Sequence, residues 1–180
     1  MSATSPAHAR LREATRDDHA RVDGCFPDGL CDVGTYRRYL RGMQALLAAL
    51  ARADAELATA FARHRALLKA DLADLGAAPF ETPPPAPHID GGAARTGARY
   101  VVEGSAMGAR LLLRQAVSLG FKDGYGARFL AYHAGQADAD WVRFRRQLAS
   151  QAPEHPDFAR LIETTRDTFA LAATCLGRDA

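Results

Sequence analysis

Apolar residues recur every three or four positions along most of this chain, a pattern that predicts amphipathic helices. Ser5 followed by Pro6 suits the start of a first helix, with a cap residue and then a proline at the first helical position. The stripe of that helix is expected to contain Leu11, Thr15, His19 and Val22. Gly24 and Pro27 disfavour helix, so the first helix should end before them.

A second helical region is expected between a cap at Thr35 and a terminal glycine at Gly76. Its apolar positions are Tyr36, Tyr39, Leu40, Met43, Leu46, Leu47, Leu50, Leu57, Phe61, Leu67, Leu68, Leu72 and Leu75. Residues 77–92 hold five of the nine prolines and cannot be helical. They could divide two domains, but neither side has an obvious core of its own. We therefore interpret them as a long loop inside a single domain that spans residues 1–180.

The C-terminal half predicts further helices, beginning with one that includes residues 100–113. A short helix should then carry Phe129, and Asp138 is expected to cap another that bears Trp141, Phe144 and Leu148. A last helix is expected over residues 157–176. Because the chain has no alternating strand pattern, the fold class is predicted to be all-α, a bundle of about seven to eight helices.

Gly104 and Gly108 lie on one face of the predicted helix at residues 100–113. Each glycine inside a helix costs roughly 1 kcal/mol relative to alanine, so two on one face need a reason. The usual reason is a close approach to the backbone, by another helix or by a flat, bulky ligand. His19 lies on the apolar stripe of the first helix, and a histidine opposite a glycine-faced helix is one way to hold haem. Both interpretations of the glycines stay open at this point.

His19 has two neighbours that favour a ligand over an ordinary buried histidine. Asp23 follows one turn later, where it can hold an imidazole N–H and fix the tautomer. Arg12 lies two turns earlier on the same face and could reach an anionic edge of a ligand. The other histidines are weaker candidates. His8 and His64 have polar neighbours, His88 and His155 lie in proline-rich loops, and His133 is either structural or a second ligand.

Composition and motifs narrow the function classes. The net charge of +2 and the lack of a Lys/Arg run argue against nucleic acid as a partner. No apolar run approaches the roughly 20 residues that span a bilayer. Three cysteines without a CxxC motif, and no signal peptide before them, predict ordinary thiols in a cytoplasmic protein. There is also no Glu-x-x-His pair, HExxH, GxSxG or GxGxxG motif to indicate a dinuclear metal site, a hydrolase or a phosphate loop.

Four segments, in order over roughly residues 10–176, carry a family signal. They are Leu11-Arg-Glu-Ala-Thr15 with His19 and Asp23, Leu68-x-x-Asp71-Leu72-x-x-Leu75-Gly76, Tyr100-Val-Val-Glu-Gly-Ser-Ala-Met-Gly108, and Phe129-x-x-Tyr132 with Trp141-x-x-Phe144-x-x-x-Leu148. Together they resemble the haem oxygenase family, in particular its bacterial and bacteriophytochrome-associated members. The resemblance implies a helical bundle in which haem lies between a proximal and a distal helix.

The resemblance also implies an activity. His19 would be the axial ligand of the haem iron, and Gly104 and Gly108 would let the distal backbone lie almost on the haem face. Haem would be both cofactor and substrate, and O2 would be directed toward one meso carbon. The products would be biliverdin, carbon monoxide and ferrous iron. An external reductant, such as a ferredoxin or flavodoxin reductase system, would supply electrons, and a bacteriophytochrome could receive the biliverdin.

Further site residues follow from the same resemblance. Arg12 and Arg146 would hold the haem propionates, with Arg143 in reserve, because guanidinium suits carboxylate. Phe169 falls where the family places an aromatic residue in the distal wall. Two departures stand out. Ser105 replaces an aspartate that organises proton-delivering water in several members, and His133 follows Tyr132 where relatives often have glycine.

Two other function classes remain open on the sequence alone. One is a haem-binding or haem-carrying protein that lacks turnover, for which the only support is Ser105. The other is an enzyme of thiamin- or quinone-related metabolism on the same fold, against which the Glu-Gly-Ser-x-x-Gly helix speaks.

Overall fold

A computed structural model describes residues 5–178, except for the side chains of residues 137–140. The helices are α1 (Pro6–Ala14), α2 (Arg16–Asp23), α3 (Val33–Ala53), α4 (Ala55–Ala60), α5 (Ala62–Asp74), α6 (Gly91–Ser118), α7 (Arg128–Ala149) and α8 (Pro156–Leu176). The only extended pairing in the described part of the chain is a set of isolated bridges from Lys122 to Tyr125 and Gly126. The expected all-α class is therefore confirmed. No helix in the described residues is long and apolar enough to cross a membrane.

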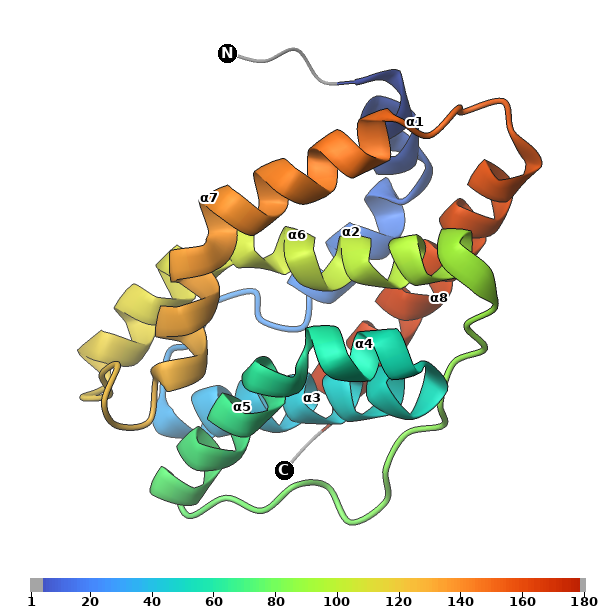
Figure 1. Cartoon of the computed structure of the whole chain (residues 1–180). Coiled ribbons are helices and arrows are strands. Elements are labelled where there is room, and N and C mark those ends of the chain that lie inside the picture. Colours follow the sequence, from blue (N-terminus) through green and yellow to red (C-terminus); the bar gives the residue numbers. More distant parts are fainter. Residues whose placement is uncertain (1–4, 179–180) are drawn as a thin grey trace.

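Helix α6 is the longest helix and occupies the centre of the bundle (Figure 1). It packs against α7 and α8, while α3 packs against α4, α5 and α8. Helix α5 also meets α7, which closes the bundle on the side away from α8. The two N-terminal helices attach at different places, since α1 packs on α7 and α2 packs on α8.

Two glycines let α8 approach its neighbours closely. A Cβ added at Gly97 of α6 would come 2.5 Å from the carbonyl oxygen of Leu161, and Thr165 Oγ1 donates a hydrogen bond to the Gly97 carbonyl at 3.2 Å. On α3, a Cβ at Gly42 would come 2.8 Å from the Leu176 side chain. Since both positions exclude a side chain, α8 is fixed firmly against α6 and α3.

The first predicted helix is divided in two at Thr15. Ser5 and Pro6 begin α1 as expected, with the Ser5 side chain accepting from the backbone N–H of His8. At the division the Thr15 hydroxyl donates to the Leu11 carbonyl at 2.9 Å, and Arg166 of α8 donates to the Ala14 carbonyl at 2.8 Å. Because these bonds satisfy the carbonyls at the bend, α2 can leave the direction of α1.

The second predicted region is interrupted at two places, and its cap differs from the expected one. Asp32, and not Thr35, caps α3, because the Asp32 carboxylate accepts from the Thr35 backbone N–H at 2.7 Å. The first interruption is at Asp54, which ends α3 and caps α4, and the second is at Phe61, between α4 and α5. Gly76 adopts φ +60° just after α5, as a terminal glycine should.

Helix α7 is one continuous helix, so the separate helix capped by Asp138 is not formed; the Asp138 side chain itself lies outside the described part. The start of α7 is fixed by buried Asp71 of α5. Its two carboxylate oxygens accept from the backbone N–H groups of Arg128 at 3.0 Å and of Phe129 at 2.8 Å. Asp71 thereby does for α7 what a cap residue would do, from a different helix.

Candidate functional site

The candidate site begins with His19 on α2. His19 Nδ1 lies 2.9 Å from Asp23 Oδ2, and 62% of the His19 side chain is exposed. No residue of α2 is buried, so His19 is not the core residue that its apolar stripe suggested. With Nδ1 donating to the carboxylate, the lone pair of the neutral ring is on Nε2. The imidazole is therefore oriented and has its basic nitrogen on the other side of the ring.

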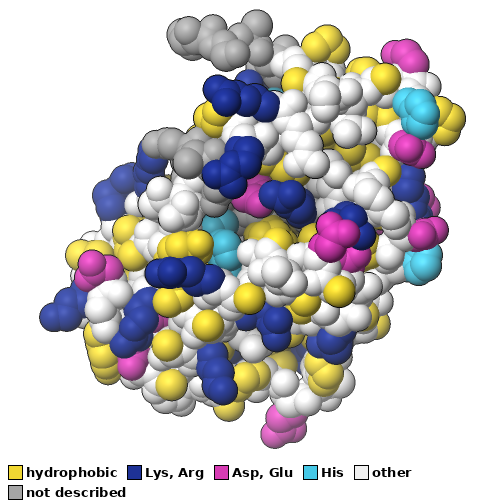
Figure 2. Space-filling view, in the orientation of Figure 1, with side chains coloured by type: hydrophobic (Ala, Val, Ile, Leu, Met, Phe, Trp, Pro, Cys, Tyr) yellow, Lys and Arg dark blue, Asp and Glu magenta, His cyan; other side chains and the backbone are white. Residues whose placement is uncertain are grey.

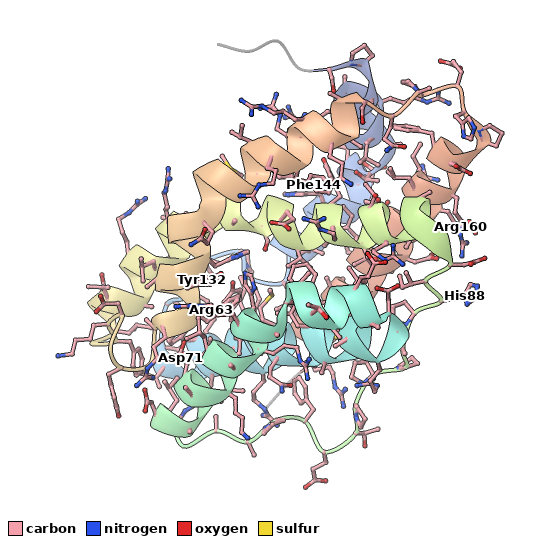
Figure 3. The ribbon with its side chains drawn as sticks, viewed as in Figure 1. Arg63, Asp71, His88, Tyr132, Phe144 and Arg160 are labelled. Atoms are coloured by element: carbon pink, nitrogen blue, oxygen red, sulfur yellow. The ribbon has the colours of Figure 1, made fainter. Side chains whose placement is uncertain are left out.

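A cluster of aromatic side chains connects α2 with the glycine face of α6. The His19 ring lies 5.7 Å from Phe169, and Phe169 lies 6.5 Å from Tyr100, measured between ring centroids. Tyr100 in turn lies 5.8 Å from Trp141, which stacks on Phe144 at 13° between ring planes. Figure 3 shows Phe144 where α7 passes α6. The cluster brings one side chain each from α2, α6 and α8, and two from α7, into one wall.

The glycines of α6 lie on nearly one face but have different surroundings. About 100° of rotation per residue places Gly97, Gly104 and Gly108 within roughly 40° of each other around the axis. Gly97 is closed by α8, as described above. A Cβ at Gly104 would lie 3.7 Å from the Trp141 ring, and a Cβ at Gly108 would meet nothing within 4 Å. Gly108 is thus not a helix-packing glycine, and its face of α6 adjoins open space.

The loop after α2 is tied to the far end of the same helix α6. The backbone N–H of Leu30 donates to Gln115 Oε1 at 3.0 Å. Gly29 has φ +69°, and a Cβ there would come 2.4 Å from Gln115 Nε2. Since α2 rests on α8 and its loop is held by α6, the positions of His19 and of the glycine face are fixed relative to each other.

Of the predicted arginines, the structure places Arg12 near the aromatic wall. Burial raises the pKa of Tyr100 and the Arg12 guanidinium opposes that rise. Burial, and then the guanidinium groups of Arg145 and Arg12, hold the pKa of His8 below its usual value. Arg145, which the sequence analysis did not select, therefore shares surroundings with Arg12.

Arg146 lies on another side of α7. Phe144 and Leu148 define the buried side of α7, and 100° per residue puts Arg146 almost opposite to it. Both Arg143 and Arg146 are exposed. Figure 2 shows many Lys and Arg side chains over this side of the molecule. The signal that would have favoured Arg145 is its position one turn after Trp141.

Ser105 and His133, the two residues that depart from the family pattern, form a hydrogen bond with each other. Ser105 Oγ lies 2.9 Å from His133 Nε2 and also donates to the Val102 carbonyl at 2.8 Å. His133 is 2% exposed, and its Nδ1 lies 3.3 Å from His64 Nε2. His64 was interpreted as a residue in polar surroundings, and the structure shows it buried instead.

Protein side chains alone do not form a metal centre here. The described residues contain no group of three His, Cys, Asp or Glu side chains that could hold a metal ion. All three cysteines are free, and of these only Cys31 is exposed. Two surface pockets lie elsewhere, one around Arg95 and Arg99 and one around Arg10 and Arg166.

The helix order and the arrangement of α2, α6 and α8 define a haem oxygenase-like fold, and the resemblance stated from the sequence is confirmed at that level. Among solved structures, the chain is similar to the NO- and CO-bound haem oxygenase from Neisseria meningitidis, with a TM-score of 0.74 and 27% identity. The similarity covers 97% of this chain and 91% of that one. Neither a family model nor a curated protein sequence matches the chain.

Proposed function

We propose that this chain is a haem oxygenase, which opens haem to biliverdin, carbon monoxide and ferrous iron with O2 and an external reductant. The observation that carries the proposal is the pairing of two features on a haem oxygenase-like fold. One is the oriented and exposed imidazole of His19, and the other is the open glycine face at Gly108. The aromatic wall joins the two.

The residues at this site fit haem. His19 offers a neutral nitrogen, and the absent side chain of Gly108 leaves room beside the helix backbone. Phe169 supplies an apolar surface next to His19, and Arg12 and Arg145 supply positive charge near Tyr100 and His8. When bound, haem supplies an iron that activates O2 and a porphyrin ring that is the substrate.

The side chains then have separate tasks. His19 Nε2 would hold the haem iron, and Asp23 holds the ring in one orientation through Nδ1. Gly104 and Gly108 keep side chains away from the distal face, so that the α6 backbone limits the space there. Arg12 and Arg145 bind the propionates. Arg146 and Arg143 stay predictions from the family resemblance.

Partners follow from the same proposal. Electrons come from an external donor, for which a ferredoxin or flavodoxin reductase system remains the prediction. A bacteriophytochrome that receives biliverdin stays a prediction as well.

Haem titration followed by reduction in air tests the proposal. Wild type is expected to give a Soret band that is replaced by biliverdin absorption once reductant is added. His19→Ala should lose the axial ligand and most turnover, and added imidazole should restore part of it. A wild-type Soret band that persists under reductant would identify a haem carrier instead. No haem binding at all would favour a non-haem enzyme on this fold.

A further inference from the structure

Three side chains from three helices form a hydrogen-bonded chain that begins at the glycine face. Ser105 Oγ of α6 lies 2.9 Å from His133 Nε2 of α7, and His133 Nδ1 lies 3.3 Å from His64 Nε2 of α5. We call these residues the Ser105–His133–His64 chain. It runs from the candidate site into the interior between α5 and α7, with no carboxylate among its members.

Aromatic rings enclose the two imidazoles. His133 stacks on Phe129, with centroids 5.3 Å apart and planes at 17°. His64 makes edge contacts with the rings of Phe61, Phe129 and Tyr132, whose centroids lie 5.6, 6.1 and 5.1 Å from the centroid of the His64 ring. Arg63 covers the outer face of the Tyr132 ring, 4.7 Å from its centroid, and Figure 3 shows the two side by side near α5 and α7. This enclosure excludes water from the pair.

Enclosure keeps His133 neutral. Burial, and to a lesser degree the neighbouring His64, lower the pKa of His133 to about 3. A neutral imidazole has one N–H and one lone pair, so His133 donates on one side and accepts on the other. The chain therefore has two possible directions of hydrogen bonding, and its members must all point the same way.

The direction of the chain decides what the Ser105 hydroxyl can do. When His133 Nε2–H donates to Ser105 Oγ, the serine proton goes to the Val102 carbonyl, and a lone pair of Oγ is left to accept a hydrogen bond from a third group. His133 Nδ1 then accepts from His64 Nε2–H. When the chain runs the other way, Ser105 donates to His133 and its bond to the Val102 carbonyl is lost.

Ser105 is placed where that choice affects the site. It follows Gly104 directly and lies about 60° from Gly108 around the helix axis. Ser105 is exposed as a residue, whereas His133 and His64 are buried. The two buried imidazoles thus connect to a serine on the exposed part of α6, beside the glycine face.

We propose that His133 and His64 are positioning residues that fix the Ser105 hydroxyl oxygen as a hydrogen-bond acceptor toward the distal face. This inference rests on the proposed function and deepens it. The chain takes the place of a carboxylate, and it presents a neutral acceptor of set direction beside the glycine face.

The first test uses the protein without haem. With 15N-labelled histidine, NMR should show His133 as one neutral tautomer between about pH 5 and 8, because this range lies above its lowered pKa. Ser105→Ala should shift the Nε2 resonance of His133, and His64→Gln should shift its Nδ1 resonance. A His133 spectrum that neither substitution alters would overturn the chain itself.

The second test uses the ferric haem complex. Ser105→Ala and His133→Phe should move the midpoint of its pH-dependent absorption change in the same direction, by about half a pH unit or more, and lower biliverdin formation about tenfold. His133→Gln keeps a hydrogen-bond donor for Ser105. This variant should therefore restore most of the wild-type midpoint and most of the biliverdin formation. His88→Gln, at an exposed loop position, is the matched control.

The outcomes separate the two proposals. If wild type forms no biliverdin, the proposed function fails, while the NMR result on the haem-free protein still decides whether the chain exists. If wild type turns over haem, and Ser105→Ala and His133→Phe fold normally with an unchanged midpoint and rate, the positioning role is wrong. If His133→Phe does not fold, Ser105→Ala and His64→Gln decide the same question.

Discussion

Gly97 and Gly108 occupy nearly the same face of α6, about three turns apart, yet the absence of a side chain has a different cause at each. At Gly97 the cause is the backbone of α8, with the Leu161 carbonyl oxygen 2.5 Å from where a Cβ would be. At Gly108 no protein atom lies within 4 Å of that point. The difference separates a structural glycine from a candidate ligand-facing one on a single helix.

Alanine substitutions at these two glycines should therefore have opposite effects. Gly108→Ala should leave the melting temperature unchanged or raise it, by up to about 1 kcal/mol in unfolding free energy, because helix propensity improves without a clash. Gly97→Ala should lower it, because α6 and α8 must separate. Thermal denaturation of both variants without haem checks this. A destabilised Gly108→Ala would mean that this position serves helix packing after all.

The arginines offer a second comparison at residue scale. Arg12→Glu and Arg145→Glu should weaken haem binding and change the meso carbon that is cleaved, because a propionate loses a charge-assisted bond worth about 1.5–3 kcal/mol. Arg146→Glu, on the opposite side of α7, should have a smaller effect. Haem affinity and isomer analysis of the product are the measurements. If Arg146→Glu alone changes the isomer, the prediction from the family pattern is right and the geometric argument is wrong.

The sequence predicted some site residues better than others, for reasons of helix geometry. Spacing alone placed Asp23 beside His19, since residues four apart on a helix meet. His64 was misjudged from its neighbours Arg63 and Arg65, although Phe61 and Leu68, which share its face, are both buried. Its contact with His133 joins residues 69 positions apart, which no local pattern contains.

At the scale of elements, the long helical regions were predictable and their interruptions were not. Pro6 and Gly76 marked boundaries that the structure keeps, whereas the proline-rich loop predicted for residues 77–92 ends earlier, because α6 begins at Gly91. The bend at Thr15 depends on Arg166 of α8, which is distant in sequence. In the same way, α7 is started by Asp71 from α5, and its continuity past Asp138 reflects packing that spans the whole bundle.

Asp71 gives the element-scale prediction. Asp71→Asn should lower the unfolding free energy by about 2–4 kcal/mol, because a buried acceptor of two backbone N–H groups and of Arg128 Nη1 is replaced by a group that also donates. Asp74→Asn, at a partly exposed carboxylate that accepts from Gly126, should cost less. Urea denaturation of both variants measures the difference. Equal losses would show that Asp71 has no special role in starting α7.

At the scale of the whole molecule, the buried imidazole of His133 should make stability depend on pH. Its pKa is about 3 in the folded protein and near 6.5 when unfolded, so the unfolded chain binds more protons between these values. Stability should therefore fall as the pH drops below about 6.5. His133→Gln should reduce the slope of stability against pH by an amount that corresponds to at most one bound proton. His88→Gln should leave this slope unchanged. Denaturation curves at several pH values test this, and parallel curves for wild type and His133→Gln would contradict it.

In the proposed function, haem lies between His19 and the glycine face and is opened there. Chromatography of the product after incubation with haem, O2 and reductant tests it most directly, with wild type and Gly108→Ala side by side. We expect biliverdin from wild type, accompanied by carbon monoxide. Gly108→Ala should still bind haem through His19 but form little biliverdin, because a methyl group occupies space reserved at the distal face. Intact haem recovered from wild type, or full biliverdin yield from Gly108→Ala, would contradict the account.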